Sequence, residues 1–121
     1  MAFVYYNANP DNLKLPDCVI RAIQLAMDIP YSEVVMLLRN NADYYKCNEL
    51  CVCCYEKLLD NDFKLPHFIG NGLTVDEIAK RSPNNTLLIR MDSHITCAIN
   101  GVVFDIFDCT NEIVTDFWIV K

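Results

Sequence analysis

The chain has little of what a repetitive, low-complexity or nucleic-acid-binding protein needs. Only three of its 121 residues are glycine and five are proline, which excludes collagen-like and low-complexity sequences. The largest basic cluster is the pair Lys80 and Arg81, and the net charge is −6 at pH 7. Because such a chain repels polyanions and anionic membrane surfaces, we expect no binding to nucleic acid or to membranes.

Long hydrophobic runs and cofactor motifs are also missing. No apolar run reaches the roughly 18 residues that make a membrane-spanning helix a candidate. The N-terminal segment has no basic stretch leading into an apolar one, so we expect no signal peptide and a cytoplasmic protein. Gly70 and Gly72 are too few for a nucleotide-binding fingerprint, and no P-loop is present. We therefore predict no cofactor.

What is present is enough apolar sequence for one core. The composition, 53% hydrophobic and 21% charged, is typical of a globular protein. A length of 121 residues fits one domain, which we expect to span residues 1–121.

Helical periodicity dominates the first half of the chain. Apolar residues recur at helical spacing in residues 17–29, and again from near Ser32. A third helix is expected over residues 47–59. Thr74 and Glu77 form a capping box that predicts a short fourth helix. Loops are expected over residues 1–16 and 60–73.

The last third of the chain changes to the alternating pattern of strands. Asn100 and Gly101 favour a two-residue hairpin turn. Strands are expected over residues 86–91, 94–99, 102–108 and 113–120. Helices followed by an antiparallel meander predict an α+β fold, in which the helices pack on one face of a four-stranded antiparallel sheet.

Seven cysteines are many for a chain of this length. They are Cys18, Cys47, Cys51, Cys53, Cys54, Cys97 and Cys109. Because the number is odd and the expected compartment is reducing, a disulfide framework is not predicted. Each cysteine is then a small buried hydrophobe, a metal ligand or a nucleophile.

Cys18 is the most informative thiol, because it is expected at the first position of a helix. The free N–H groups and the dipole there carry about half a positive charge, which favours a thiolate. The same N–H groups could bind an oxyanion. Asp17, directly before it, would oppose the thiolate. The alternative interpretation is a buried structural cysteine.

His94 and two aspartates could complete a catalytic set with such a thiolate. His94 is expected to open a strand, and Asp105 and Asp108 lie on the returning strand of the same hairpin. A nucleophile, a base and an orienting acid are typical of covalent acyl transfer. A strict two-residue turn would put Asp105 on the His94 face, whereas a bulge would bring Asp108 there. A surface histidine beside acidic residues is the alternative.

Three segments resemble motifs of the papain-like cysteine peptidase superfamily. They are residues 17–23 (DCVIRAI), 88–90 (LIR) and 94–109, in which HITC is followed by GVVFDIFDC. The likeness covers most of the chain from residue 11 on and is to small single-domain bacterial and phage proteins. It implies a papain-like fold without fixing a substrate.

The resemblance also implies roles for individual residues. Cys18 would be the nucleophile and His94 the base. Asp108 matches the spacing of the orienting acid better than Asp105 does. Asn12, six residues before Cys18, falls where papain-like enzymes place an amide side chain, usually that of glutamine, for the oxyanion.

The cysteines of the third expected helix form a second constellation. On one continuous helix Cys47, Cys51 and Cys54 would share a face, and three thiolates with a fourth ligand such as His67 could bind Zn²⁺. The C-x2-C spacing usual in structural zinc sites is absent, and free cysteine is often simply buried. The second interpretation is favoured, so no metal site is predicted.

Several other residues have simpler expected roles. Arg21 is expected to form a salt bridge with Asp17. Cys97 is expected in the core, and Cys109 near the proposed site. His67 is expected at the surface.

Two functions from different classes follow from these residues. The first is a cysteine-dependent acyl-transfer enzyme, of peptidase or amidase type, that acts on a peptide or protein through a thioester. The second is a non-catalytic papain-like module that binds a protein partner, for example a phage-encoded modulator of a host protein. A low thiol pKa at Cys18, with His94 in hydrogen-bond reach, would favour the enzyme.

Overall fold

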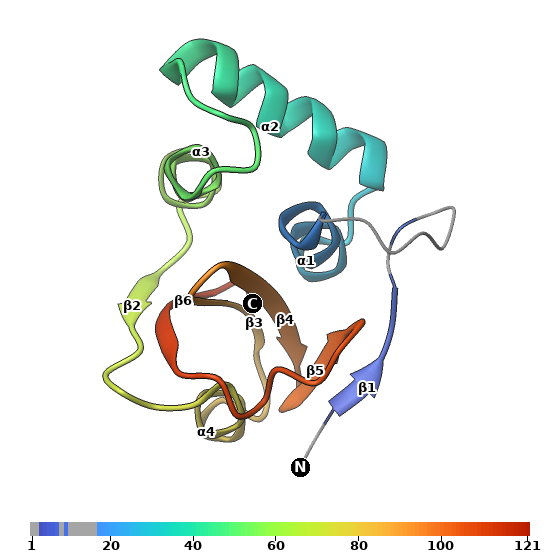
Figure 1. The fold of residues 1–121 in the computed structure, drawn as a ribbon, viewed down its shortest axis with the longest axis vertical. Coiled ribbons are helices and arrows are strands. Elements are labelled where there is room, and N and C mark those ends of the chain that lie inside the picture. Colours follow the sequence, from blue (N-terminus) through green and yellow to red (C-terminus); the bar gives the residue numbers. More distant parts are fainter. Residues whose placement is uncertain (1–2, 8, 10–16) are drawn as a thin grey trace.

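The structure is a computed structural model that describes residues 3–7, 9 and 17–121. Helices dominate its first half and strands its second (Figure 1). The elements are β1 (Phe3–Tyr5), α1 (Cys18–Met27), α2 (Tyr31–Tyr45), α3 (Val52–Lys57), the π-helix η1 (Leu58–Asp62), β2 (His67–Ile69), α4 (Val75–Arg81), β3 (Thr86–Met91), β4 (His94–Ile99), β5 (Val102–Asp105) and β6 (Val114–Ile119).

The strands form one six-stranded mixed sheet in the order β1-β5-β4-β3-β6-β2. The α+β class predicted from the sequence is confirmed, and the four predicted strands form the centre of the sheet. The prediction of a purely antiparallel, four-stranded sheet is wrong, because β1 pairs in parallel with β5 and β2 pairs with β6. Each added strand has three residues, too few to show an alternating pattern.

The hairpin between β4 and β5 has the expected two-residue turn. Asn100 and Gly101 both have positive φ, 51° and 81°, as a type I′ turn requires. Ile99 therefore pairs with Val102, and the register continues without a bulge to the pair Cys97 and Phe104. This register decides which side chains of β5 share a face with those of β4.

Both faces of the sheet are covered. One apolar cluster joins α1, α2, α3 and η1 to one face, and a second joins α4 to the other. Figure 1 shows α1 and α4 on opposite sides of the strands. The expectation that all helices pack on one face is therefore wrong. The bounds of β3 and β4 match the prediction, whereas β5 ends at Asp105 rather than at residue 108. Alternation along β3 sends Leu88 to one cluster and Leu87 and Ile89 to the other.

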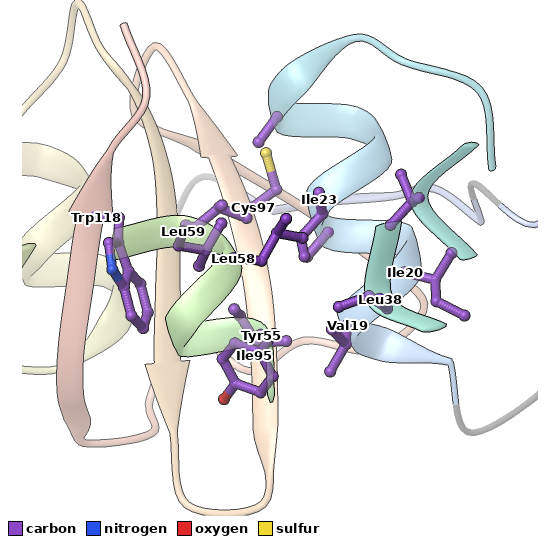
Figure 2. Close-up of a cluster of buried hydrophobic side chains, with 14 of the residues drawn as sticks. Val19, Ile20, Ile23, Leu38, Tyr55, Leu58, Leu59, Ile95, Cys97 and Trp118 are labelled. Carbon is purple, nitrogen blue, oxygen red and sulfur yellow. The ribbon is translucent and has the colours of Figure 1, made fainter. Parts of the chain in front are cut away.

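The first cluster holds η1 and α1 against the sheet. Figure 2 shows Leu58 and Leu59 between Trp118 of β6 and Ile23 of α1, and all four side chains are fully buried. Burying an aliphatic side chain of this size contributes about 1.5–3 kcal/mol. This packing fixes α1 on the sheet, with its first residue near the start of β4.

The third helix differs most from its expected bounds. Residues 47–51 form turns rather than helix, and α3 begins at Val52 with Cys51 as its N-cap. Cys47, Cys51 and Cys54 therefore do not share the face of one continuous helix. By contrast, the capping box of Thr74 and Glu77 is present at the start of α4. None of the helices among the described residues is long and apolar enough to cross a membrane.

Candidate active site

Cys18 is the first residue of α1 and lies half-buried beside the start of β4. Burial raises the pKa of its thiol. A hydrogen bond with His94, a backbone hydrogen bond from Ile95 and the charges of His94 and Arg21 outweigh burial and leave the pKa below its usual value. The free N–H groups at the start of a ten-residue helix act in the same direction. The surroundings of Cys18 therefore favour the thiolate over the thiol.

His94 lies between a carboxylate and this thiol. Its Nε2 is 2.7 Å from Oδ2 of Asp105, and its side chain is only 12% exposed. Burial lowers the pKa of the ring, but hydrogen bonds with Asp105, Cys109 and Cys18 raise it to about 11. Both Cys18 and Cys109 therefore interact with a ring that Asp105 holds through Nε2. The pKa of the thiol falls while that of the ring rises, and both directions favour a thiolate–imidazolium pair.

The carboxylate that bonds His94 is that of Asp105, not that of Asp108. Asp108 is exposed, and its carboxylate accepts hydrogen bonds from the backbone and hydroxyl of Thr110. The resemblance implied Asp108, but Asp108 lies beyond the end of β5, and the β4–β5 register has no bulge between Val102 and Phe104. Of the two alternatives left open by the sequence, the structure has the one in which a two-residue turn places Asp105 on the His94 face.

Arg21 links Asp105 to a second buried carboxylate. Its Nε is 2.6 Å from Oδ1 of Asp17, and Nη1 is 3.3 Å from Oδ1 of Asp105. Oδ2 of Asp17 also accepts hydrogen bonds from the Tyr31 hydroxyl, at 2.7 Å, and from Nδ2 of Asn9, at 3.0 Å. Buried charges require this kind of pairing. The network holds Asp105, and through it His94, in one orientation.

The sequence revealed only half of this network. The salt bridge between Arg21 and Asp17 was expected and is present, and the two residues are four positions apart at the start of α1. The second partner, Asp105, is 84 residues away. It could not be found from local spacing. Asp17 does not cap α1 with its side chain, because Arg21 and Tyr31 engage its carboxylate.

A groove opens beside the thiol and the imidazole. Its volume is about 140 Å³, and it is lined by Cys18, His94 and a set of mostly apolar residues. That set includes Leu50, Val52, Tyr55 and Met91. Sequence reasoning missed these lining residues, since they come from three separate elements. A bound group could reach the sulfur from this side while its apolar part is removed from water.

Asn12, the expected oxyanion donor, lies outside the described residues. The backbone N–H of Cys18 is at the start of α1, where N–H groups have no partner within the helix. The N–H of Cys18 is therefore a candidate oxyanion donor among the described residues.

Comparisons of the chain with protein-family models, curated proteins and solved structures gave no match. The chemistry of the site therefore rests on its own geometry.

The remaining cysteines divide into buried and accessible groups. Cys97 is fully buried in the sheet, as expected. Cys109 is buried next to the site, with its sulfur 3.9 Å from Oδ2 of Asp105. Near the start of α3, the sulfurs of Cys51 and Cys53 lie 2.8 Å apart.

Two groups of side chains have ligand atoms close enough to hold a metal ion. Among the described residues they are His94 with Asp105 and Cys109, and His67 with Glu56 and Asp116. No three of the thiols at residues 47–54 form such a group. His67, suggested as their fourth ligand, is instead hydrogen-bonded to Asp60 and Asp116.

Proposed function

We propose that the chain is a cysteine-dependent acyl-transfer enzyme of peptidase or amidase type, built on a papain-like arrangement. Cys18 is its nucleophile, His94 its base and acid, and Asp105 the residue that orients His94. One observation carries the proposal. His94 bonds Asp105 through one ring nitrogen and interacts with Cys18, with the pKa of the ring raised and that of the thiol lowered.

The first half of the reaction uses this ion pair. The Cys18 thiolate attacks the carbonyl carbon of an amide, and the backbone N–H of Cys18 donates to the oxyanion that forms. The His94 imidazolium gives its proton to the leaving nitrogen as the C–N bond breaks. An amine departs and the acyl group stays on sulfur as a thioester.

The second half regenerates the enzyme. Neutral His94 takes a proton from water, or from an acceptor amine, as that nucleophile attacks the thioester. The C–S bond then breaks and the thiolate returns. Asp105 stays ionised throughout, since burial raises its pKa but the hydrogen bond and charge of His94 lower it below the usual value. It holds the ring and stabilises the imidazolium.

The groove supports a peptide or protein substrate. Leu50, Val52 and Met91 offer contact to an apolar side chain beside the scissile bond. The acidic chain carries no basic cluster that would favour an anionic substrate.

Alkylation of Cys18 by iodoacetamide at different pH values tests the proposal. Peptide mapping separates Cys18 from the other six thiols, and buried Cys97 is the internal reference for unfolding. We expect an apparent thiol pKa well below the roughly 8.5 of a free cysteine, and we expect His94→Ala to restore the ordinary value. An ordinary Cys18 that is indifferent to His94→Ala would overturn the enzyme and favour the protein-binding module.

A further inference from the structure

The segment between α2 and α3 combines four thiols with the wall of the groove. Cys47, Cys51, Cys53 and Cys54 all lie within residues 47–54. Leu50 and Val52, interleaved with them, line the groove beside Cys18 and His94. The proposed acyl-transfer reaction uses none of these four thiols.

Two of the four thiols are positioned for a reaction with each other. Sγ of Cys51 and Sγ of Cys53 are 2.8 Å apart, about 0.75 Å more than a disulfide bond of about 2.05 Å. The backbone N–H of Cys53 also donates to Sγ of Cys51, at 3.4 Å. Little movement separates this pair from a covalent bond.

The two sulfurs have different chemical characters. The hydrogen bond from the Cys53 thiol, together with backbone hydrogen bonds, lowers the pKa of Cys51. The same hydrogen bond raises the pKa of Cys53 to about 12. Cys51 is therefore the thiolate that attacks first, and Cys53 is the thiol that resolves.

Solvent exposure also favours a reaction of Cys51 with Cys53 over one that involves Cys54. Cys53 is exposed and Cys51 is half-buried, so a small oxidant can reach both. Cys54 is buried, and its thiol donates to the backbone oxygen of Leu38 at 3.3 Å. Cys47 lies near Cys53, whose pKa it also raises through a hydrogen bond. It is the competing partner.

We propose that Cys51 and Cys53 form a dithiol–disulfide redox site on the rim of the groove, oxidised by a low-molecular-weight disulfide such as glutathione disulfide. The Cys51 thiolate attacks one sulfur of the oxidant and releases one glutathione thiolate, which leaves a mixed disulfide. Cys53 loses its proton to solvent and attacks the Cys51 sulfur, which releases the second glutathione. Two electrons pass from the protein to the oxidant.

The disulfide has a structural consequence for the groove. Val52 lies between the two cysteines and Leu50 directly precedes them, so the new covalent ring restrains this wall. The redox site is independent of the proposed function. Its effect on the groove is read at Cys18, whose thiol can be alkylated whether or not it is catalytic.

The experiment equilibrates the full chain in buffers of increasing glutathione disulfide to glutathione ratio. Free thiols are then blocked with iodoacetamide and the peptides are mapped by mass spectrometry. We expect a product lighter by two hydrogens, with the bond joining Cys51 to Cys53. Cys53→Ser should accumulate glutathione on Cys51, whereas Cys51→Ser should leave Cys53 mostly free. Cys97→Ser is the matched control and should behave as wild type.

The outcomes separate the two proposals. A bond between Cys47 and Cys53, or free Cys51 and Cys53 at the most oxidising ratio, overturns the redox site. Oxidation should change the rate of Cys18 alkylation at least twofold in wild type and not in Cys51→Ser, in which Cys53 stays mostly free. An unchanged rate with the bond formed overturns the link to the groove. A Cys18 whose thiol alkylates with an ordinary pKa contradicts the acyl-transfer proposal. The redox proposal is tested separately, because the mass of the peptide shows whether the disulfide has formed.

Discussion

Both histidines of the chain are paired with carboxylates, but only His94 also interacts with thiols. At the first site the order is Asp17, Arg21, Asp105, His94 and Cys18, with negative and positive groups alternating. At the second site, near β2, both ring nitrogens of His67 face carboxylates.

The second site is complete without a ligand. His67 lies between Asp60, at 3.1 Å, and Asp116, at 2.5 Å, and Arg90 pairs with Asp116. The ring also stacks on Trp118, with centroids 4.3 Å apart. No ring nitrogen is left for chemistry, so this site joins β2 and η1 to β6. The comparison shows that the alternation of charges alone does not make a catalytic site. The first site differs in that the His94 ring also interacts with the thiol of Cys18.

The largest effect on the free energy of unfolding should come from removing the Arg21 guanidinium, which pairs with both buried acids, Asp17 and Asp105. Arg21→Met keeps the volume but leaves Asp17 and Asp105 without their cation. Breaking a buried ion pair in this way costs about 3–5 kcal/mol. Urea unfolding at pH 7 measures the loss. Arg39→Met is the control, since its pair with Glu49 is exposed and contributes at most about 1 kcal/mol. A similar, small loss in both variants would contradict the network.

The next effect distinguishes the two candidate acids of the first site. Asp105→Asn removes the charge that stabilises the imidazolium, so the rate of Cys18 alkylation at pH 6 should fall about tenfold, or about 1.4 kcal/mol. Asp108→Asn should leave the rate unchanged, because Asp108 bonds Thr110. Equal rates for the two variants would show that neither acid orients His94.

A smaller effect should sharpen the contrast between the histidines. His67→Gln loses at least one of two hydrogen bonds to carboxylates, and we expect a loss of about 1–2 kcal/mol in the free energy of unfolding. The alkylation rate of Cys18 should not change. A slower Cys18 in this variant would mean that the two sites are coupled across the sheet.

The last prediction is the pH dependence of stability at His94. Its folded pKa is raised to about 11, against about 6.5 in the unfolded chain. Its contribution is therefore complete below about pH 6.5 and is lost as the pH rises through about 11. Urea unfolding of wild type and His94→Gln should show a stability difference that shrinks from pH 6 to pH 10.5. A difference that grows over this range would contradict the raised pKa.

Local signals predicted the parts of the fold that depend on neighbouring residues. The capping box at Thr74, the turn at Asn100 and the bounds of β3 were all correct. The strand register then indicated Asp105 correctly. Asp108 was preferred because its distance in sequence from His94 matches the papain-like proteins. In this hairpin that distance does not bring Asp108 to His94.

Long-range pairing accounts for what was missed. β1 and β2 are strands only because β5 and β6 offer them free edges. The third helix was predicted too long, because the pattern of cysteines fits a helix while residues 47–51 turn instead.

The sequence by itself determined the α+β class, the hairpin register and the residue types of the candidate site, because these depend on periodicity and on turn chemistry over a few residues. Only the tertiary structure decided that Arg21 joins Asp17 to Asp105, that His94 meets Cys18, and that Leu50 and Val52 line a groove there. The physical reason is that burial and pairing of charges depend on segments up to 84 residues apart, and local pattern carries no information on them.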